Sequence, residues 1–380
     1  MENQNRSRRL AWTAAAAALV LSMSQAANAQ TFGLIESEIH SSGYTLYAPI
    51  RGTSAYLIDG KGRLIKRWQD PDGYSGGASS YLTKRGTLVR AMLKGDSGNA
   101  GAGNGGLIRE YDWDGNVIWD YDYDDPSYWT HHDIALMPNG HVIITAFEFV
   151  LLDENNSCRN ADGSINRVDP ETEGAQRFDH LIEVDPNYKT GYGGKTEWEW
   201  HLCDHLDDGT SAAKWDVSLN QSYNAINYTA LRDQILIGCN ACNEMFIIDH
   251  NTNSHEAAGS KGDFIYRWGN PGNYGATGDT LLGGQHTVRF IRPEFGNDLL
   301  NHGNTNNTGN IIAYNNRHMG FNSAVIEITP PYNAATNDYG THAPGVGFEP
   351  ADYAAVLMDI TDDTGARNFF SGFLSSGQKL

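Results

Sequence analysis

The feature that most constrains the fold is an alternation of two kinds of short strand pair along most of the chain. The first kind is a strand, a turn containing Asp, Asn or Gly, and a second strand that ends in an aromatic residue. Apolar and polar residues alternating around such turns are typical of β-hairpins. Pairs of this kind occur at 55–68 (AYLIDGKGRLIKRW), 108–121 (IREYDWDGNVIWDY), 181–200 and 245–268, and 323–331 opens another.

A second kind of pair follows each of the first. It occurs at 77–92, 131–146 (HHDIALMPNGHVIITA), 222–239 and 284–316, and a last copy begins at 375–380 (SSGQKL). Two consecutive pairs make a four-stranded sheet, and radial repetition of such sheets makes a β-propeller. We therefore predict an all-β β-propeller with an incomplete last blade, formed by one domain over 30–380; a family resemblance described below implies six blades. A single β-sandwich is the alternative.

Residues 1–29 have the three parts of a secretory signal peptide. A basic leader precedes the apolar stretch LAWTAAAAALVLSM, and Ala27-Asn28-Ala29 is a small-residue cleavage site. We expect cleavage before Gln30 and a periplasmic or secreted protein. The apolar stretch is short for a membrane span and no later segment competes with it, so we expect no membrane-spanning helix.

Charge and motifs narrow the possible partners. The net charge of −19 repels nucleic acid and anionic lipid, so an anionic substrate would need a local basic pocket. No phosphate-binding lysine loop or dinucleotide fingerprint occurs in the right context, and we expect no cofactor.

The four cysteines are an even number, which in an oxidising compartment indicates disulfides. Cys239 and Cys242 have the spacing of a redox motif, but no strand-then-helix context surrounds them, and no second pair of zinc ligands is evident. We predict one or two structural disulfides among Cys158, Cys203, Cys239 and Cys242, with the pairing open.

Alignment of the second kind of pair on its turns places His132 opposite His286. These positions begin the innermost strands of a propeller, which converge on the central channel. We therefore predict a shared pocket there, with His131 as a partner or as part of its wall. Other residues at or beside these aligned positions are Asp133, Thr287, Ser222, Tyr223 and Asn224.

Imidazoles around one channel can transfer protons, bind an oxyanion when protonated, or ligate a metal. A third metal ligand is lacking unless Asp133 turns inward, so we assign no metal. Arg317, which follows Asn316, offers a planar fork to sulfate, phosphate or carboxylate oxygens. Histidines and an arginine in an acidic protein indicate an anionic group held at the channel. His201 and His205, in a long insertion, are interpreted as structural.

Several segments, in this order along the chain, resemble the bacterial arylsulfotransferase family of six-bladed propellers. They are REYDWDGNVIWDYDYDD, HHDIALMPNGHVIITAFE, IIDHNTNSHEAAGSKGDFIYRWGNP, GQHTVRFI and GNIIAYNN, and the resemblance runs from about Tyr56 to the C-terminus. It implies transfer of a sulfuryl group from a phenolic sulfate ester to a phenol, without a nucleotide donor, through a sulfated histidine.

On the matching motifs, the resemblance implies catalytic roles for His132, its neighbour His131, His286 and Arg317. We assign substrate contacts to the residues around them, which are Asp133, Ser222, Tyr223, Asn224 and Asn316. The chain departs from the family at two positions. The register places Ser376 where the family carries its sulfated histidine, and Ser222 stands where similar sequences carry another histidine.

The function predicted is therefore periplasmic sulfuryl transfer from an aryl sulfate to a phenol. Two alternatives remain open. One is a non-catalytic exported propeller that binds an anionic or glycan ligand, and the other is a hydrolase or lyase that reuses the histidine pocket.

Overall fold

The computed structural model describes most of the chain from residue 43 onward. The described residues are 43–94, 103–207, 209, 211–219, 221–291, 309–318, 322–336, 338–340, 342, 347–348, 350–357, 370–372 and 375–376. The predicted signal peptide, residues 1–29, lies outside them. No helix in the described part of the chain has both the length and the apolar character needed to cross a bilayer.

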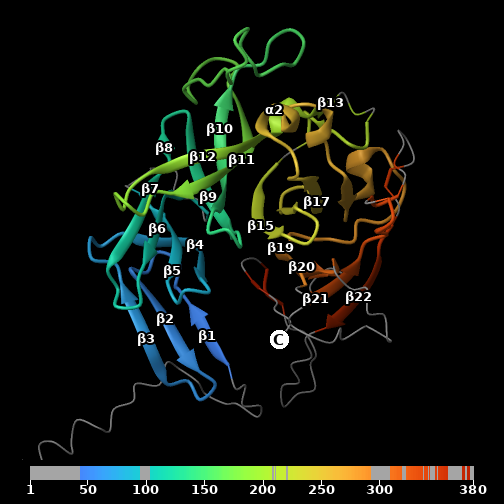
Figure 1. Cartoon of the computed structure of the whole chain (residues 1–380). Helices are drawn as coiled ribbons and strands as arrows, with labels where there is room; N and C mark the ends of the chain where they lie inside the picture. Colours follow the sequence, from blue (N-terminus) through green and yellow to red (C-terminus); the bar gives the residue numbers. More distant parts are fainter. Residues whose placement is uncertain are drawn as a thin grey trace, which may run out of the picture.

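Five antiparallel sheets follow one another along the chain, and Figure 1 shows them arranged around a common centre, from blue to red. We call them blades 1 to 5. Blade 1 contains β1 (Tyr44–Tyr47), β2 (Ser54–Asp59) and β3 (Leu64–Gln69). Blade 2 contains β4 (Ser75–Leu82), β5 (Leu88–Leu93), β6 (Gly106–Tyr111) and β7 (Val117–Asp122).

Blade 3 is the largest sheet, with the order β12-β11-β10-β9-β8. Its strands are β8 (Asp124–Asp125), β9 (Tyr128–Leu136), β10 (Val142–Val150), β11 (Gln176–Pro186) and β12 (Gly194–His201). Blade 4 contains β15 (Tyr223–Thr229), β16 (Gln234–Cys239), β17 (Glu244–Asp249) and β18 (Tyr266–Trp268). Blade 5 contains β19 (His286–Phe290), β20 (Ile311–His318), β21 (Asn322–Thr329) and β22 (Asp352–Leu357).

Short elements occupy the connections. β13 (Leu206–Asp207) and β14 (Trp215–Asp216) form a small parallel pair. The helical turns are η1 (Leu202–Asp204), α2 (Ser254–Ala257), η2 (Ser260–Gly262) and η3 (Pro271–Tyr274). Asn253 and Glu256 form a capping box at the start of α2, which explains a helix in so short a segment.

A tryptophan of the outer strand of a blade joins that blade to the next. The indole Nε1 of Trp68 in β3 donates to the carbonyl of Asp112 in blade 2 at 2.9 Å. Trp119 in β7 donates to Gly193 beside blade 3 at 2.7 Å. Trp200 in β12 donates to Gly262 of η2 at 2.8 Å. All three indoles are fully buried, so each fills the space between blades and satisfies its one polar atom there.

The all-β propeller prediction is confirmed, and each predicted strand pair that lies in described residues forms strands. The described residues form five blades, however, whereas the sequence analysis predicts six. The sixth blade was implied by the resemblance to a six-bladed family, and the last blade was expected to begin its inner strands at 375–380. Ser375 and Ser376 belong to no strand, and 377–380 lie outside the described residues.

Candidate functional site

The innermost strands of the blades adjoin one another around the centre of the ring. β9 packs against both β4 and β15, and β15 packs against β19. The ladders of β4, β15 and β19 carry bulges close to the first residues of these strands, and the ladder of β9 carries its bulge in mid-strand, at 131–133. A bulge redirects the side chains at that point, and such sites are common beside binding pockets. The predicted site residues of β9, β15 and β19 therefore lie at or beside bulges of strands that line the channel.

Two bulge residues have left-handed backbones, His132 with φ 47° and Thr287 with φ 53°. Residues other than glycine rarely adopt this conformation. In β9 the left-handed residue is therefore the second histidine, His132. In β19 it is the residue that follows the histidine, Thr287. The alignment on turns paired His132 with His286, whereas the backbone pairs His132 with Thr287. The two registers differ because a bulge adds residues that a count of alternating positions does not detect.

The adjacent histidines of β9 form a chain with a carboxylate of β11, two strands away in the same blade. The Nδ1 atoms of His131 and His132 are 2.9 Å apart and hydrogen-bonded. His131 Nε2 lies 2.8 Å from Oδ1 of Asp179 in β11, in a contact too bent to count as a hydrogen bond. The His131 ring stacks on Phe147, with 3.7 Å between ring centroids. This packing holds the first imidazole between the carboxylate and the second imidazole.

Burial sets the protonation states of this chain. Burial, together with the charge of Arg177, lowers the pKa of His131 to about 3. Burial and the neighbouring His131, His286 and Arg177 lower the pKa of His132 to about 3 as well. Both rings are therefore neutral near pH 7. Burial raises the pKa of Asp179 to about 7, although Arg177 opposes that shift. A neutral imidazole has a lone pair that can accept a proton or attack an electrophile.

His286 lies near enough to His132 to contribute to the lowering of its pKa. Its own Nδ1 contacts Oδ1 of Asn316 at 2.7 Å and the carbonyl of Gly284 at 3.0 Å. Since both partners accept hydrogen bonds, they fix the tautomer with the proton on Nδ1, and Nε2 keeps its lone pair. Burial lowers the pKa of His286 as well. The structure therefore brings His132, His286 and Asn316 into one region.

Asp133 contacts residues of several blades, and its predicted contact with substrate stays a prediction. Its Oδ1 accepts hydrogen bonds from Tyr81 at 2.5 Å and from the amide of Ile134 at 2.9 Å, and its Oδ2 accepts from the amide of Ile226 at 3.1 Å. Arg289 of β19 lies 3.7 Å from the same carboxylate and also contacts the Tyr81 hydroxyl. Asp133 thus joins blades 2, 3, 4 and 5 at the channel.

The three predicted residues of blade 4 lie at the start of β15. Tyr223 is fully buried, and Ser222 and Asn224 are half-buried. The Asn224 side chain donates to the carbonyl of Gln285 at 2.8 Å, next to His286. Burial and the charge of Asp179 raise the pKa of Tyr223. Tyr223 therefore remains a neutral phenol, and Asn224 joins blade 4 to the start of β19.

Arg317 makes no side-chain contact with the histidines among the described residues. A bulge in β20 between Asn315 and His318 accompanies an exposed Arg317, next to the fully buried Asn316. Among the described residues, its side chain makes no hydrogen bond or ion pair. The arginines near the channel are instead Arg177 and Arg289, which sequence reasoning missed together with Asp179 and Tyr81. Arg289 stands in the quoted segment GQHTVRFI, so alternation along that strand was the signal that could have indicated it.

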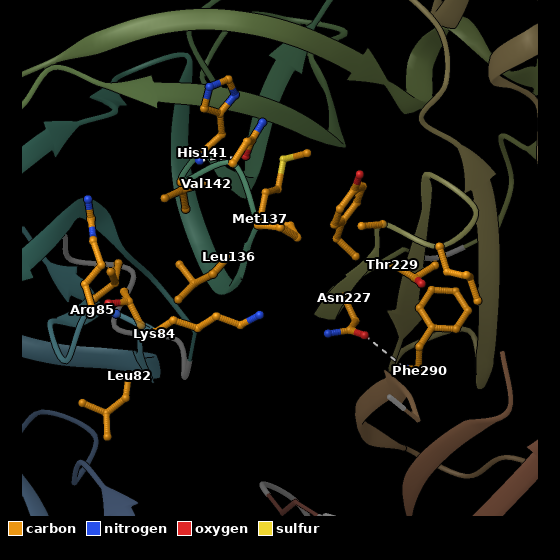
Figure 2. Close-up of a pocket in the computed structure, with 18 of the residues that line it drawn as sticks. Leu82, Lys84, Arg85, Leu136, Met137, His141, Val142, Asn227, Thr229 and Phe290 are labelled. Carbon is orange, nitrogen blue, oxygen red and sulfur yellow. Dashed lines mark hydrogen bonds between the residues drawn. The ribbon is translucent and has the colours of Figure 1, made fainter. Parts of the chain in front are cut away.

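A pocket of about 640 Å³ lies at the other end of the innermost strands. Figure 2 shows Met137 and Leu136 on one side of it and Asn227, Thr229 and Phe290 on the other. Met137 is five residues along the chain from His132, which corresponds to roughly 16 Å of extended strand. The pocket is therefore distinct from the histidine chain.

The channel histidines do not form a metal-ligating group with nearby carboxylates within the described residues. The group there that brings three such donors together is Glu148, His180 and His201, in the outer part of blade 3. The structure also shows the Cys158–Cys203 disulfide, and Cys239 and Cys242 have Cα atoms 5.5 Å apart, within the range for a disulfide.

The antiparallel sheets arranged around a channel define the protein as a β-propeller. No protein-family model and no curated protein matches the chain. Solved structures resemble it at low identity. A protein of unknown function from Bacteroides caccae has 12% identity and a TM-score of 0.41, over 79% of this chain and 72% of that one.

Two further solved structures show the same level of similarity. Hydrazine synthase of Kuenenia stuttgartiensis has 12% identity and a TM-score of 0.41, over 72% of this chain and 64% of that one. The Cps50 (Swd1) β-propeller domain of Myceliophteria thermophila has 13% identity and a TM-score of 0.38, over 82% of this chain and 72% of that one. Similarity at this level carries no functional argument.

Proposed function

We propose that the protein transfers a sulfuryl group from an aryl sulfate to a phenol at the channel end of β9. The observation that carries the proposal is the chain from Asp179 through His131 to His132, with His286 nearby. The resemblance of the quoted motifs to arylsulfotransferases supports the choice of sulfuryl chemistry. The predicted signal peptide and the Cys158–Cys203 disulfide support a periplasmic or secreted location.

In this mechanism His132 is the nucleophile. The Nε2–H group of His131 faces the Asp179 carboxylate, and Nδ1 of His131 accepts a hydrogen bond from the Nδ1–H group of His132. In this tautomer the lone pair of His132 is on Nε2. That lone pair attacks the sulfur atom of the aryl sulfate. The N–S bond forms as the S–O bond to the ring breaks, and the phenolate leaves. Positive charge on His132 is shared through His131 with Asp179, as in other nucleophile–base–carboxylate chains.

The second half of the reaction reverses these changes. His286 Nε2 accepts the proton of the incoming phenol, whose oxygen then attacks the sulfur atom. The new S–O bond forms as the N–S bond breaks, and the electron pair returns to His132. The proton on His286 passes to the departed phenolate through solvent. The net result exchanges one aryl sulfate and one phenol for another such pair, and His132 takes the role that the family gives to its final-blade histidine.

The experiment follows release of p-nitrophenol from p-nitrophenyl sulfate by the full chain, with and without 1-naphthol. Release that depends on naphthol supports transfer, whereas equal release without naphthol indicates a hydrolase. His132→Gln should abolish release, and His255→Gln, an exposed histidine on α2, should leave it unchanged. No naphthol-dependent release by the folded wild type would overturn the proposal.

The pocket at the other end of the channel favours non-catalytic ligand binding as a second function. Apolar side chains such as Leu136 and Phe290 line it beside Lys84, which is exposed and has no ion-pair partner among the described residues. Arg85, by contrast, is paired with Glu110 and Tyr188. A ligand with an apolar body and an anionic group would fit. Binding of p-nitrophenyl sulfate that Lys84→Ala weakens and His132→Gln leaves unchanged would support this function.

A further inference from the structure

A second buried group of ionisable side chains lies in blade 3, outside the channel. Glu148 is in β10. His180 is in β11, where it pairs with Ala146 of β10, and His201 is in β12, where it pairs with His180. Glu148 and His180 are fully buried, and His201 is 1% exposed. Three neighbouring strands thus present one carboxylate and two imidazoles to the same point.

The distances between the donor atoms are close to those of a metal site. Glu148 Oε1 lies 2.8 Å from His201 Nδ1, and Glu148 Oε2 lies 3.9 Å from His180 Nδ1. One donor atom from each residue lies within 4.8 Å of the others. Bonds of about 2.0 to 2.2 Å in a tetrahedral site place donor atoms about 3.3 Å apart. Changes of roughly half an ångström in the two distances from Glu148 to the imidazoles would reach this spacing.

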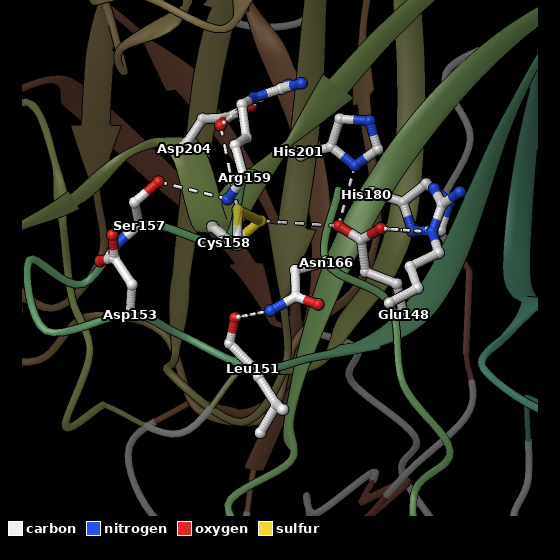
Figure 3. The surroundings of a disulfide bond; sticks show 12 residues. Glu148, Leu151, Asp153, Ser157, Cys158, Arg159, Asn166, His180, His201 and Asp204 are labelled. Carbon is white, nitrogen blue, oxygen red and sulfur yellow. Dashed lines mark hydrogen bonds and ion pairs between the residues drawn. A yellow bond between two sulfur atoms is a disulfide. The ribbon is translucent and has the colours of Figure 1, made fainter. Parts of the chain in front are cut away.

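Both imidazoles are held by their outer nitrogen atoms. Nε2 of His180 contacts the hydroxyl of Tyr123 at 2.9 Å, and Nε2 of His201 contacts Oε2 of Glu199 at 3.3 Å. The rings are stacked, with centroids 5.2 Å apart and planes inclined by 12°. Metal-binding histidines are usually held by an outer partner of this kind, which turns the other nitrogen toward the metal. Figure 3 shows Glu148 between His180 and His201.

An unsatisfied atom points to a missing ligand. Nδ1 of His180 is buried and has no hydrogen bond among the described residues. A buried polar atom without a partner is costly, and such atoms in folded proteins usually mark a water or an ion. The Nδ1 atom faces Glu148, so a bound cation would satisfy it.

The surroundings limit what the group can bind. Arg167 Nε contacts Glu148 Oε2 at 3.0 Å, so one carboxylate oxygen is shared with a guanidinium. Cys203 Sγ lies 3.8 Å from Glu148 Oε1, but it is bonded to Cys158 and therefore provides no thiolate. The available donors are one oxygen atom and two nitrogen atoms. Such a set suits zinc and other divalent transition metals rather than calcium or magnesium.

We propose that Glu148, His180 and His201 bind one divalent transition-metal ion, with Zn²⁺ as the best fit. Binding replaces the hydrogen bond between His201 and Glu148 with bonds to the metal, and the His201 Nδ1 proton leaves to solvent. Three protein ligands leave a fourth position for water. The site is independent of the proposed sulfuryl transfer, because its three ligands take no part in that reaction.

The test measures the metal content of the full-length protein and then its affinity for Zn²⁺ after treatment with a chelator. We expect about one equivalent of metal and a visible Co²⁺ spectrum typical of four-coordinate cobalt. Glu148→Gln and His180→Gln remove ligands and should weaken Zn²⁺ binding more than about 100-fold. Tyr123→Phe and Glu199→Gln keep the ligands and remove an outer partner, so each should weaken binding about 10-fold.

His250→Gln is the matched control. His250 also contacts a glutamate of β11, Glu183, at 3.0 Å, but it belongs to no three-donor group among the described residues. Its Zn²⁺ affinity should equal that of the wild type. The proposal is overturned if the folded wild type binds neither Zn²⁺ nor Co²⁺, or if folded Tyr123→Phe, Glu199→Gln and Glu148→Gln all bind Zn²⁺ as tightly as the wild type.

Discussion

At the scale of single residues, the position of His132 depends on its own backbone and on a glycine that faces it. His132 has a left-handed backbone, which costs about 1 kcal/mol or more outside glycine. A Cβ atom added to Gly103 would lie 2.3 Å from Nε2 of the His132 ring. The proposed nucleophilic nitrogen therefore lies against a glycine that cannot carry a side chain without displacing it.

Gly103→Ala should consequently reduce turnover of p-nitrophenyl sulfate and lower the free energy of unfolding by about 1–3 kcal/mol. The control is Gly86→Ala. Gly86 also has a positive φ, of 78°, but an added Cβ would meet no atom within 4 Å. It should cost about 1 kcal/mol and leave turnover unchanged. Equal turnover in the two variants would show that the position of His132 does not matter for the reaction.

The raised pKa of Asp179 leads us to expect that turnover depends on pH. Its pKa is raised to about 7 by burial, so the carboxyl is ionised above that pH and protonated below it. Because the mechanism needs an ionised carboxylate to accept the His131 proton, turnover should fall as the pH decreases through about 7. Asp179→Asn should lose at least about 100-fold in kcat and lose this step in the pH profile. An unchanged profile in the variant would assign the step to another group.

At the scale of elements, the buried tryptophans of the outer strands show why the sequence repeat contains aromatic residues: they fill the space between neighbouring blades. Trp119→Phe keeps most of the apolar volume but removes the hydrogen bond to Gly193. It should lower the free energy of unfolding by about 1–3 kcal/mol, measured by urea denaturation. Trp113, which is 46% exposed, offers the comparison, and Trp113→Phe should stay within about 0.5 kcal/mol of the wild type.

The strand pairs could be read from the sequence because turn residues and alternation are local signals. Gly140, with φ 95°, closes the turn between β9 and β10 where the Pro-Asn-Gly sequence predicts it. The bulges gave no such signal, since an extra residue interrupts the alternation on which the prediction depends. This is why the backbone pairs His132 with Thr287, whereas the alignment on turns pairs it with His286. Arg177 and Asp179 lie just before the first-kind pair at 181–200, where neither a turn residue nor the alternation indicates a position beside the channel.

At the scale of the whole molecule, the Cys158–Cys203 disulfide closes the longest covalent loop, with a sequence separation of 45. Replacing both cysteines by alanine should lower the free energy of unfolding by about 4 kcal/mol, because the unfolded chain regains freedom. Thermal unfolding of the oxidised wild type and of the variant measures the difference. The corresponding change at Cys239 and Cys242, three residues apart, should cost less than half as much. Equal effects would show that loop length does not govern this stabilisation.

The number of blades could not be read from the repeats alone. The sequence signals strand pairs, but the angle between neighbouring sheets, which sets how many complete the ring, depends on the packing of side chains between them. These spaces are filled by Trp68, Trp119 and Trp200. The positions of these tryptophans in the sequence do not determine the angle between neighbouring sheets. Export, predicted from residues 1–29, concerns a segment outside the described residues and remains a prediction.

The Asp133 carboxylate holds backbone amides of two blades at once, those of Ile134 and Ile226. An amide exchanges its hydrogen with solvent when its acceptor is lost, so these two protons should have one common opening rate, although they are far apart in sequence. In Asp133→Asn, where the side chain keeps one carbonyl oxygen, the rates should diverge. Isotope exchange at two positions would then report directly on whether neighbouring blades open together or one at a time.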